Sequence, residues 1–140
     1  MDAMMMNAMS KDMTVMDGMP AMDEAMMQTM QACMDACAAC EQACTICSVQ
    51  MMDGHGMDCA PACMNCADMC HAMMRTMMRM QGMTMTAMTA MLDACIEMCR
   101  MCMDACASHA DMSPVCKMCA DACQACIDAC MAMKGAMAAA

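Results

Sequence analysis

The chain has 140 residues, of which 18 are cysteine and 35 are methionine, and it has no aromatic residue. Its formal net charge is −10 and its six Lys and Arg residues are scattered. Without a basic stripe for a phosphate backbone or an aromatic ring to stack on a base, nucleic acid is not an expected partner. No apolar run is long enough to span a bilayer, so a membrane is not an expected partner either.

The composition also predicts the fold class. The chain has one Leu, three Ile and three Val, so its interior must be built from Met, Ala and Cys. Alanine and methionine favour helices, whereas the residues that favour strands are nearly missing. We therefore predict an all-α protein, and the length predicts a single domain.

A methionine-rich tail precedes the first predicted helix. Residues 1–20 are low in complexity, and we expect them to form an irregular, flexible extension. Pro20 with Asp23 and Glu24 indicates a helix opening, because proline fits the first turn and acids favour the positive end of the helix dipole. This helix is predicted over about 22–52, where the sequence DGHG ends it.

Two further helices follow. The second is predicted over about 59–81, with Asp58 as its N-cap and Gly82 as its C-terminal stop. The third is predicted over about 86–109.

The fourth helix has a clear start signal. Ser113 is the expected N-cap and Pro114 the first helical residue. The helix is predicted over about 114–134 and ends at Gly135. Four long helices joined by short loops predict an antiparallel four-helix bundle over residues 21–140.

All eighteen cysteines follow one spacing along these helices. In CMDACAACEQACTIC, from Cys33 to Cys47, the gaps are 4, 3, 4 and 3, and the same alternation recurs in the other three helices. This spacing is typical of residues that face the interior of a bundle. The candidate metal ligands are Cys33, Cys37, Cys40, Cys44, Cys47, Cys59, Cys63, Cys66, Cys70, Cys95, Cys99, Cys102, Cys106, Cys116, Cys119, Cys123, Cys126 and Cys130.

The antiparallel order brings these cysteines together. They flank the first and third interhelical loops, which lie at the same end of the bundle, so we expect the thiols to converge there. Other residues extend the inward-facing pattern, mostly toward the opposite end. The possible secondary ligands are Met26, Met30, Met73, Met77, Met80, Met88, Met91, Met133, Met137 and His109.

Soft sulfur ligands favour Cu(I) among the common biological metals. Cu(I) accepts two or three sulfurs, and side chains four residues apart on a helix are neighbours about 6 Å apart. Structural zinc instead uses four tetrahedral ligands, usually from CxxC pairs in tight turns, and here the CxxC pairs lie inside helices. The iron–sulfur cysteine spacing is absent. The pattern therefore predicts that the chain stores several Cu(I) ions.

Three alternatives to copper storage remain open at this stage. Buried cysteines can serve as plain packing, and cysteines on facing helices can form disulfides in a structural or interaction bundle. A thiolate sink for zinc or cadmium is the third. For the methionines, packing alone is an equal alternative, because methionine fills core gaps.

The acidic residues do not predict catalysis. They fall off the inward-facing positions, as at Asp35, Glu41 and Asp121, and are expected on a solvated face rather than in acid–base pairs. We therefore do not expect an enzyme.

The cysteine arrays resemble a known family, the bacterial copper storage proteins, over about residues 30–131. The stretch CKMCADACQACIDAC from Cys116 to Cys130 is the most similar, and CMDACAACEQAC and CIEMCRMCMDAC resemble other helices of that family. The resemblance implies a homotetramer of bundles that holds many Cu(I) ions on cysteine thiolates. Family members are cytosolic or exported. Since residues 1–22 do not resemble a secretory signal, we expect a cytoplasmic protein, or a periplasmic or exported one if a signal was removed.

Overall fold

Helices make up the described part of the chain. The computed structural model describes residues 3–12, 23–50, 59–111 and 113–138. The elements in chain order are α1 (Ala3–Asp12), α2 (Glu24–Gln50), α3 (Ala60–Met77), the short 3-10 helix η1 (Met80–Gly82), α4 (Met85–Ala107) and α5 (Pro114–Ala138). No described helix is long and apolar enough to cross a membrane.

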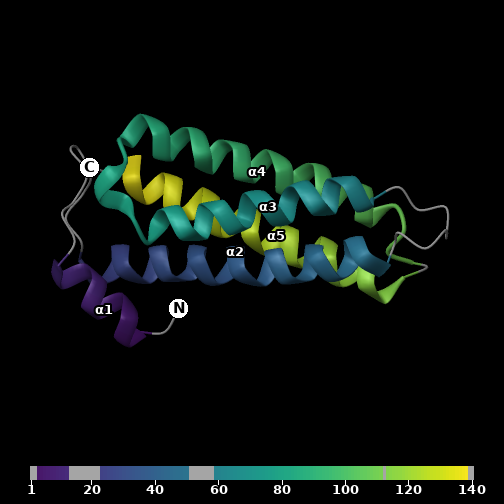
Figure 1. Ribbon diagram of the computed structural model, residues 1–140, viewed down its shortest axis with the longest axis horizontal. Helices are drawn as coiled ribbons and strands as arrows, with labels where there is room; N and C mark the ends of the chain where they lie inside the picture. The colour runs from purple at the N-terminus through teal and green to yellow at the C-terminus, as the bar shows by residue number, and fades with distance from the viewer. Residues whose placement is uncertain (1–2, 13–22, 51–58, 112, 139–140) are drawn as a thin grey trace.

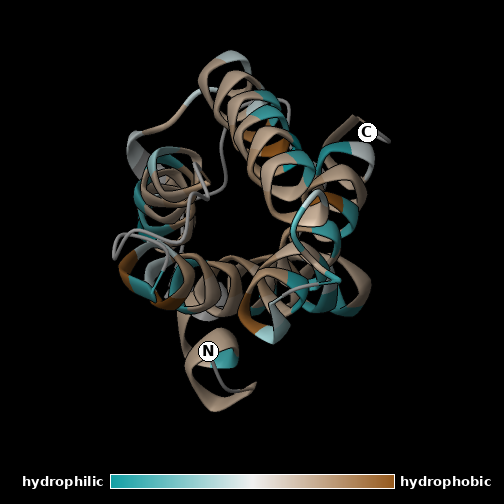
Figure 2. Cartoon of the chain, turned by 90° about the vertical axis from the view of Figure 1, so that its right-hand side faces the viewer, coloured by the Kyte–Doolittle hydropathy of each residue, from teal (hydrophilic) through white to brown (hydrophobic). Residues whose placement is uncertain are grey.

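The four long helices form an antiparallel bundle. They lie side by side with alternating direction (Figure 1), and the end view shows them arranged around a common interior (Figure 2). α2 packs against α3 and α5, and α4 packs against the same two helices. The predicted all-α four-helix bundle is therefore confirmed.

Side-chain caps fix where three of these helices begin. The Asp23 carboxylate accepts a hydrogen bond from the Met26 amide at 2.8 Å, so Asp23 is an N-cap rather than a first-turn residue. Thr84 accepts from the Ala87 amide at 3.1 Å. Ser113, the predicted N-cap of α5, accepts from the Cys116 amide at 3.2 Å. The predicted signals at Pro20, at Asp58 and in the DGHG sequence lie outside the described residues.

Both predicted glycine stops are wrong. α3 ends at Met77, and Gly82 closes η1 instead. α5 continues through Gly135 to Ala138. Neither glycine has the left-handed φ that a helix stop of this kind requires. In α5 the buried side chain of Met137, which is 2% exposed, packs in the core one turn after Met133 and favours continuing the helix.

The expectation that residues 1–20 are irregular is also wrong for Ala3–Asp12, which form α1. This helix lies beside the start of α2, at the end of the bundle away from the α2–α3 connection (Figure 1). Its segment is rich in Met and Ala, which favour helices. Met6 is 2% exposed and belongs to the core, so packing adds to that propensity.

Candidate metal centre

Every cysteine lies in the core of the bundle. All eighteen side chains are completely buried, and the structure records all of them as free thiols. They come from α2, α4 and α5 and from α3 with the residue before it, Cys59. The alternating gaps of four and three residues keep each set on the inner face of its helix. The structure thus brings together all the thiols that the sequence singles out.

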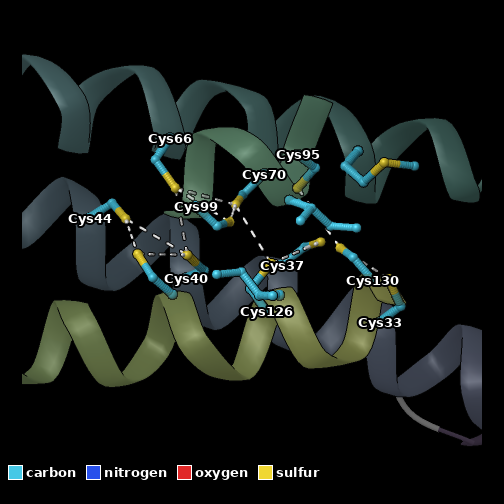
Figure 3. Packing of buried hydrophobic residues seen from close by; sticks show 14 of the residues in the cluster. Cys33, Cys37, Cys40, Cys44, Cys66, Cys70, Cys95, Cys99, Cys126 and Cys130 are labelled. Atoms are coloured by element: carbon cyan, nitrogen blue, oxygen red, sulfur yellow. Dashed lines mark hydrogen bonds between the residues drawn. The ribbon is translucent and has the colours of Figure 1, made fainter. Parts of the chain in front are cut away.

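The sulfurs form a continuous column along the bundle axis, which we call the thiol column. At the end nearer the buried methionines, Cys33 and Cys130 have their Sγ atoms 3.7 Å apart. Further along, the Sγ atoms of Cys44 and Cys102 are 3.8 Å apart. The Sγ atom of Cys63 lies 3.5 Å from that of Cys106. Figure 3 shows sulfurs from different helices pointing toward one another in the section of the column from Cys33 to Cys44.

Many thiols of the column gather in groups of four. Within each group, all four Sγ atoms lie within 4.8 Å of one another. Five such groups are Cys37, Cys95, Cys126 and Cys130; Cys40, Cys70, Cys99 and Cys126; Cys40, Cys44, Cys66 and Cys123; Cys44, Cys102, Cys119 and Cys123; and Cys47, Cys59, Cys106 and Cys116. The first four groups are linked in sequence, because Cys126, Cys40, Cys44 and Cys123 each belong to two of them.

The geometry differs from that of a disulfide core. The Sγ atoms of Cys63 and Cys102, for example, lie 3.5 Å apart. A disulfide bond requires about 2.05 Å. The structure therefore shows thiols that are close enough to share a metal ion and are not joined covalently.

Burial and mutual contact shift the acidity of the thiols. Burial raises the pKa of Cys47 and Cys59 above the ordinary 9.0, and the charges of Cys119 and Cys116, respectively, add to this effect. In the interior, hydrogen bonding with Cys126 and Cys130 lowers the pKa of Cys95. Cu(I) must displace the protons of these thiols, since the thiolate is the ligand.

Buried methionines extend the core beyond the cysteines. We call them the methionine end: Met26, Met30, Met73, Met77, Met80, Met88, Met133 and Met137 are all at most 5% exposed. Met91, which the sequence placed with them, is only half-buried. Leu92, fully buried, occupies the inward position instead, because it continues the alternation from Met88 to Cys95.

Sequence reasoning missed two buried methionines. Met34 is 1% exposed, although it does not lie at one of the inward positions that the cysteine spacing marks. Its position next to Cys33 in the sequence gave no indication that it is buried. Met6 was missed because α1 was not expected.

The histidines have different environments. His109 lies in the turn after α4, and its buried Nδ1 has no hydrogen-bond partner among the described residues. Its backbone amide donates to the Cys106 carbonyl at 3.0 Å, so the backbone of His109 lies one turn beyond the last cysteine of α4. His71 pairs on the surface with Glu41 at 2.9 Å. His55 lies outside the described residues.

The acidic side chains that the structure describes lie on the outside, as expected. Asp35, Asp93 and Asp121 are exposed, and Glu41 is half-buried. Asp93 and Asp121 pair with Lys134 at 2.6 Å and with Lys117 at 2.9 Å. These are surface ion pairs rather than paired carboxylates.

Comparison with solved structures identifies close likenesses. The copper storage protein Ccsp from Streptomyces lividans loaded with 10 copper equivalents has 30% identity and a TM-score of 0.80, and the match covers 93% of this chain and 98% of that one. A structure of copper loading to a cytosolic copper storage protein from Streptomyces lividans, with five coppers, has 34% identity and a TM-score of 0.74, over 77% of this chain and 93% of that one. A Streptomyces lividans Ccsp mutant has 33% identity and a TM-score of 0.75, and the match covers 79% of this chain and 95% of that one.

Of two comparisons made with the sequence, one found a match. A search of curated proteins found none. Residues 21–135, which include all eighteen cysteines, match the sequence profile named copper storage protein. The chain therefore belongs to the copper storage protein family.

Proposed function

We propose that this chain stores and sequesters multiple Cu(I) ions on the cysteine thiolates of the thiol column. The observation that carries the proposal is the sharing of cysteines between successive four-thiol groups. A shared thiolate can bridge two ions, so the column offers a chain of linked sites with few ligands each. This arrangement suits Cu(I), which is soft and accepts low coordination numbers.

X-ray absorption of the copper-loaded protein tests this assignment. We expect sulfur ligands only, two or three per ion, and a copper–copper contribution from bridging thiolates. Zinc added in equal amount should not displace the copper. Displacement by zinc, or nitrogen and oxygen as the main ligands, would favour a different metal.

We further propose a direction of loading. The column ends on one side at the methionine end, where neutral thioethers line the core. Thioethers bind Cu(I) without cancelling its charge, so an ion held only there keeps an uncompensated charge in a low-dielectric core. Ions should therefore pass the methionines and rest on the thiolates, where the charge is cancelled.

We also propose a ligand role for His109. Its buried Nδ1, which has no hydrogen-bond partner among the described residues, supports a secondary ligand role at the end of the bundle where α4 ends.

We propose that the chain has no catalytic activity, acts in the cytosol, and assembles as a homotetramer. A reducing cytosol keeps thiols free, which agrees with eighteen unpaired cysteines. Analytical ultracentrifugation of the reduced protein tests the oligomer, and a single sedimenting species of about four chains is expected.

A further inference from the structure

A second group of sulfur ligands lies outside the thiol column, between α1 and α2. Met6 is 2% exposed, whereas its neighbours Met4 and Met5 are 80% and 57% exposed. Met9 and Met27 are partly buried against the same core. α1 therefore presents thioethers toward α2 as well as toward solvent.

Met6 and Met27 border a small pocket of about 180 Å³, which we call the α1–α2 pocket. Its lining residues include two methionines, one carboxylate residue and three amide residues: Met6, Met27, Glu24, Asn7, Gln28 and Gln31. Ala3 completes the wall. The lining therefore combines two soft ligands with one side chain that carries a negative charge.

The chemistry of this lining fits a Cu(I) ion. Thioethers are soft ligands that select Cu(I). The weakness of a purely thioether site is its uncompensated charge. In the α1–α2 pocket Glu24 supplies a negative charge beside the two methionines, and the amide residues keep the site polar.

On α2 the pocket lies shortly before the first cysteine of the column, because Gln31 lines the pocket and Cys33 follows two residues later. On α2, Met27, Met30 and Cys33 follow one another at three-residue spacing, which places successive side chains on neighbouring turns. Met30 is fully buried, and the Sγ atom of Cys33 lies 3.7 Å from that of Cys130. Sulfur ligands thus lead from the pocket to the first thiols.

From this arrangement we infer that the α1–α2 pocket is a Cu(I) capture site, in which Met6 and Met27 bind the ion and Glu24 compensates its charge before the ion moves to the column. The inference rests on the proposed storage function. It places the first contact with Cu(I) at α1, ahead of the methionine end of the bundle.

Loading kinetics test the capture site. The double variant Met6→Leu/Met27→Leu keeps the apolar volume and removes both thioethers. We expect it to take up Cu(I) from a Cu(I)–chelator complex severalfold more slowly than the unaltered chain, with the same final number of ions. Glu24→Gln should slow loading in the same way. The matched control Met4→Leu/Met5→Leu removes two exposed methionines of the same helix and should load at the original rate.

Methyl NMR of the unaltered protein gives a direct second readout, with methionine methyl signals assigned by single variants. Once the column is saturated, further Cu(I) should shift the signals of Met6 and Met27 and leave that of Met4 in place. Unmoved Met6 and Met27 signals, or equal slowing by the control variant, would overturn the capture site. If the unaltered chain itself failed to hold many ions, the storage function would fail instead, so the two failures are distinguishable.

Discussion

At the scale of the single residue, the thiol side chain dominates this core. Buried positions that in most bundles hold Leu or Ile hold cysteine here, and each thiol removes little apolar area from water. What a buried thiol offers instead is a soft ligand once its proton is lost. The side chains that weaken the apo core are therefore the ones that bind the ions.

Removing thiols should reduce copper capacity directly. We predict that replacing Cys37, Cys63, Cys99 and Cys123 by Ser lowers the number of tightly held Cu(I) ions by about four or more, because a hydroxyl is a hard, weak ligand for a soft ion. Titration against a competing Cu(I) chelator measures the count. An unchanged count would show that these thiols do not hold copper.

Removing thioethers at the methionine end should have a different effect. We predict that replacing Met30, Met77, Met88 and Met133 by Leu, which conserves volume, slows loading and leaves the count of tightly held ions nearly unchanged. Stopped-flow loading and titration measure the two quantities separately. If this variant lost as many ions as the serine variant, the division into entrance and store would be wrong.

The raised pKa values of Cys47 and Cys59 predict a pH dependence of the apo fold. In the unfolded chain these thiols ionise near the ordinary 9.0, and in the folded chain they do so at a higher pH. Between these two values the folded state binds more protons, so the free energy of unfolding falls as pH rises. The stabilisation is thus present at pH 7 and is lost above about pH 9.

Thermal unfolding of the reduced apo protein at neutral and alkaline pH tests whether stability falls as pH rises. We expect a lower Tm at pH 10 than at pH 7, and a smaller change after copper loading, because bound thiolates no longer titrate. A Tm of the apo protein that rises over this interval would contradict the assignment.

At the scale of the secondary-structure element, most of the bundle could be predicted because each long helix repeats one inward spacing. Leu92 shows where this prediction failed. The abundance of methionine suggested that Met91 faces the interior, but the alternation of three- and four-residue gaps places Leu92 there. α1 was missed because its burial depends on contact with α2, which local sequence does not reveal. The pairing of cysteines across helices, such as Cys63 with Cys106, likewise depends on how the helices are set against one another.

The start of α5 offers a test at this scale. We predict that Ser113→Ala lowers the free energy of unfolding by about 1 kcal/mol, because the Cys116 amide loses its side-chain acceptor. Ser108→Ala is the matched control. The Ser108 hydroxyl is exposed and donates to the Ala105 carbonyl at the C-terminal end of α4. Its removal should change the free energy of unfolding by no more than about 0.5 kcal/mol. Chemical denaturation of the apo protein measures the free energy of unfolding of both variants. Equal effects would show that the Ser113 hydroxyl does not stabilise the start of α5.

At the scale of the whole molecule, charge separates the surface from the interior. The chain carries a formal net charge of −10 when its thiols are neutral. One Cu(I) for each thiolate leaves that net charge unchanged, because every proton released is replaced by a monovalent ion. The protein can therefore fill its core without altering the net charge of its surface.

Copper should also stabilise the fold as a whole. Ions that bind the thiol column of the folded state, and do not bind the unfolded chain as tightly, shift the folding equilibrium by mass action. We predict a markedly higher Tm for the copper-loaded protein than for the reduced apo protein, measured by circular dichroism. Equal melting curves would contradict this. A fold that is lost simply on adding reductant would favour disulfides over metal.

The central claim, that the eighteen thiols form a store for many ions, is tested most directly by anaerobic titration of the reduced protein with Cu(I) against a competing chelator. With bridging thiolates, about one ion per cysteine is expected, roughly 15 to 20 Cu(I) per chain, given the preference of soft ligands for this ion. Saturation at one or two ions per chain would contradict the claim.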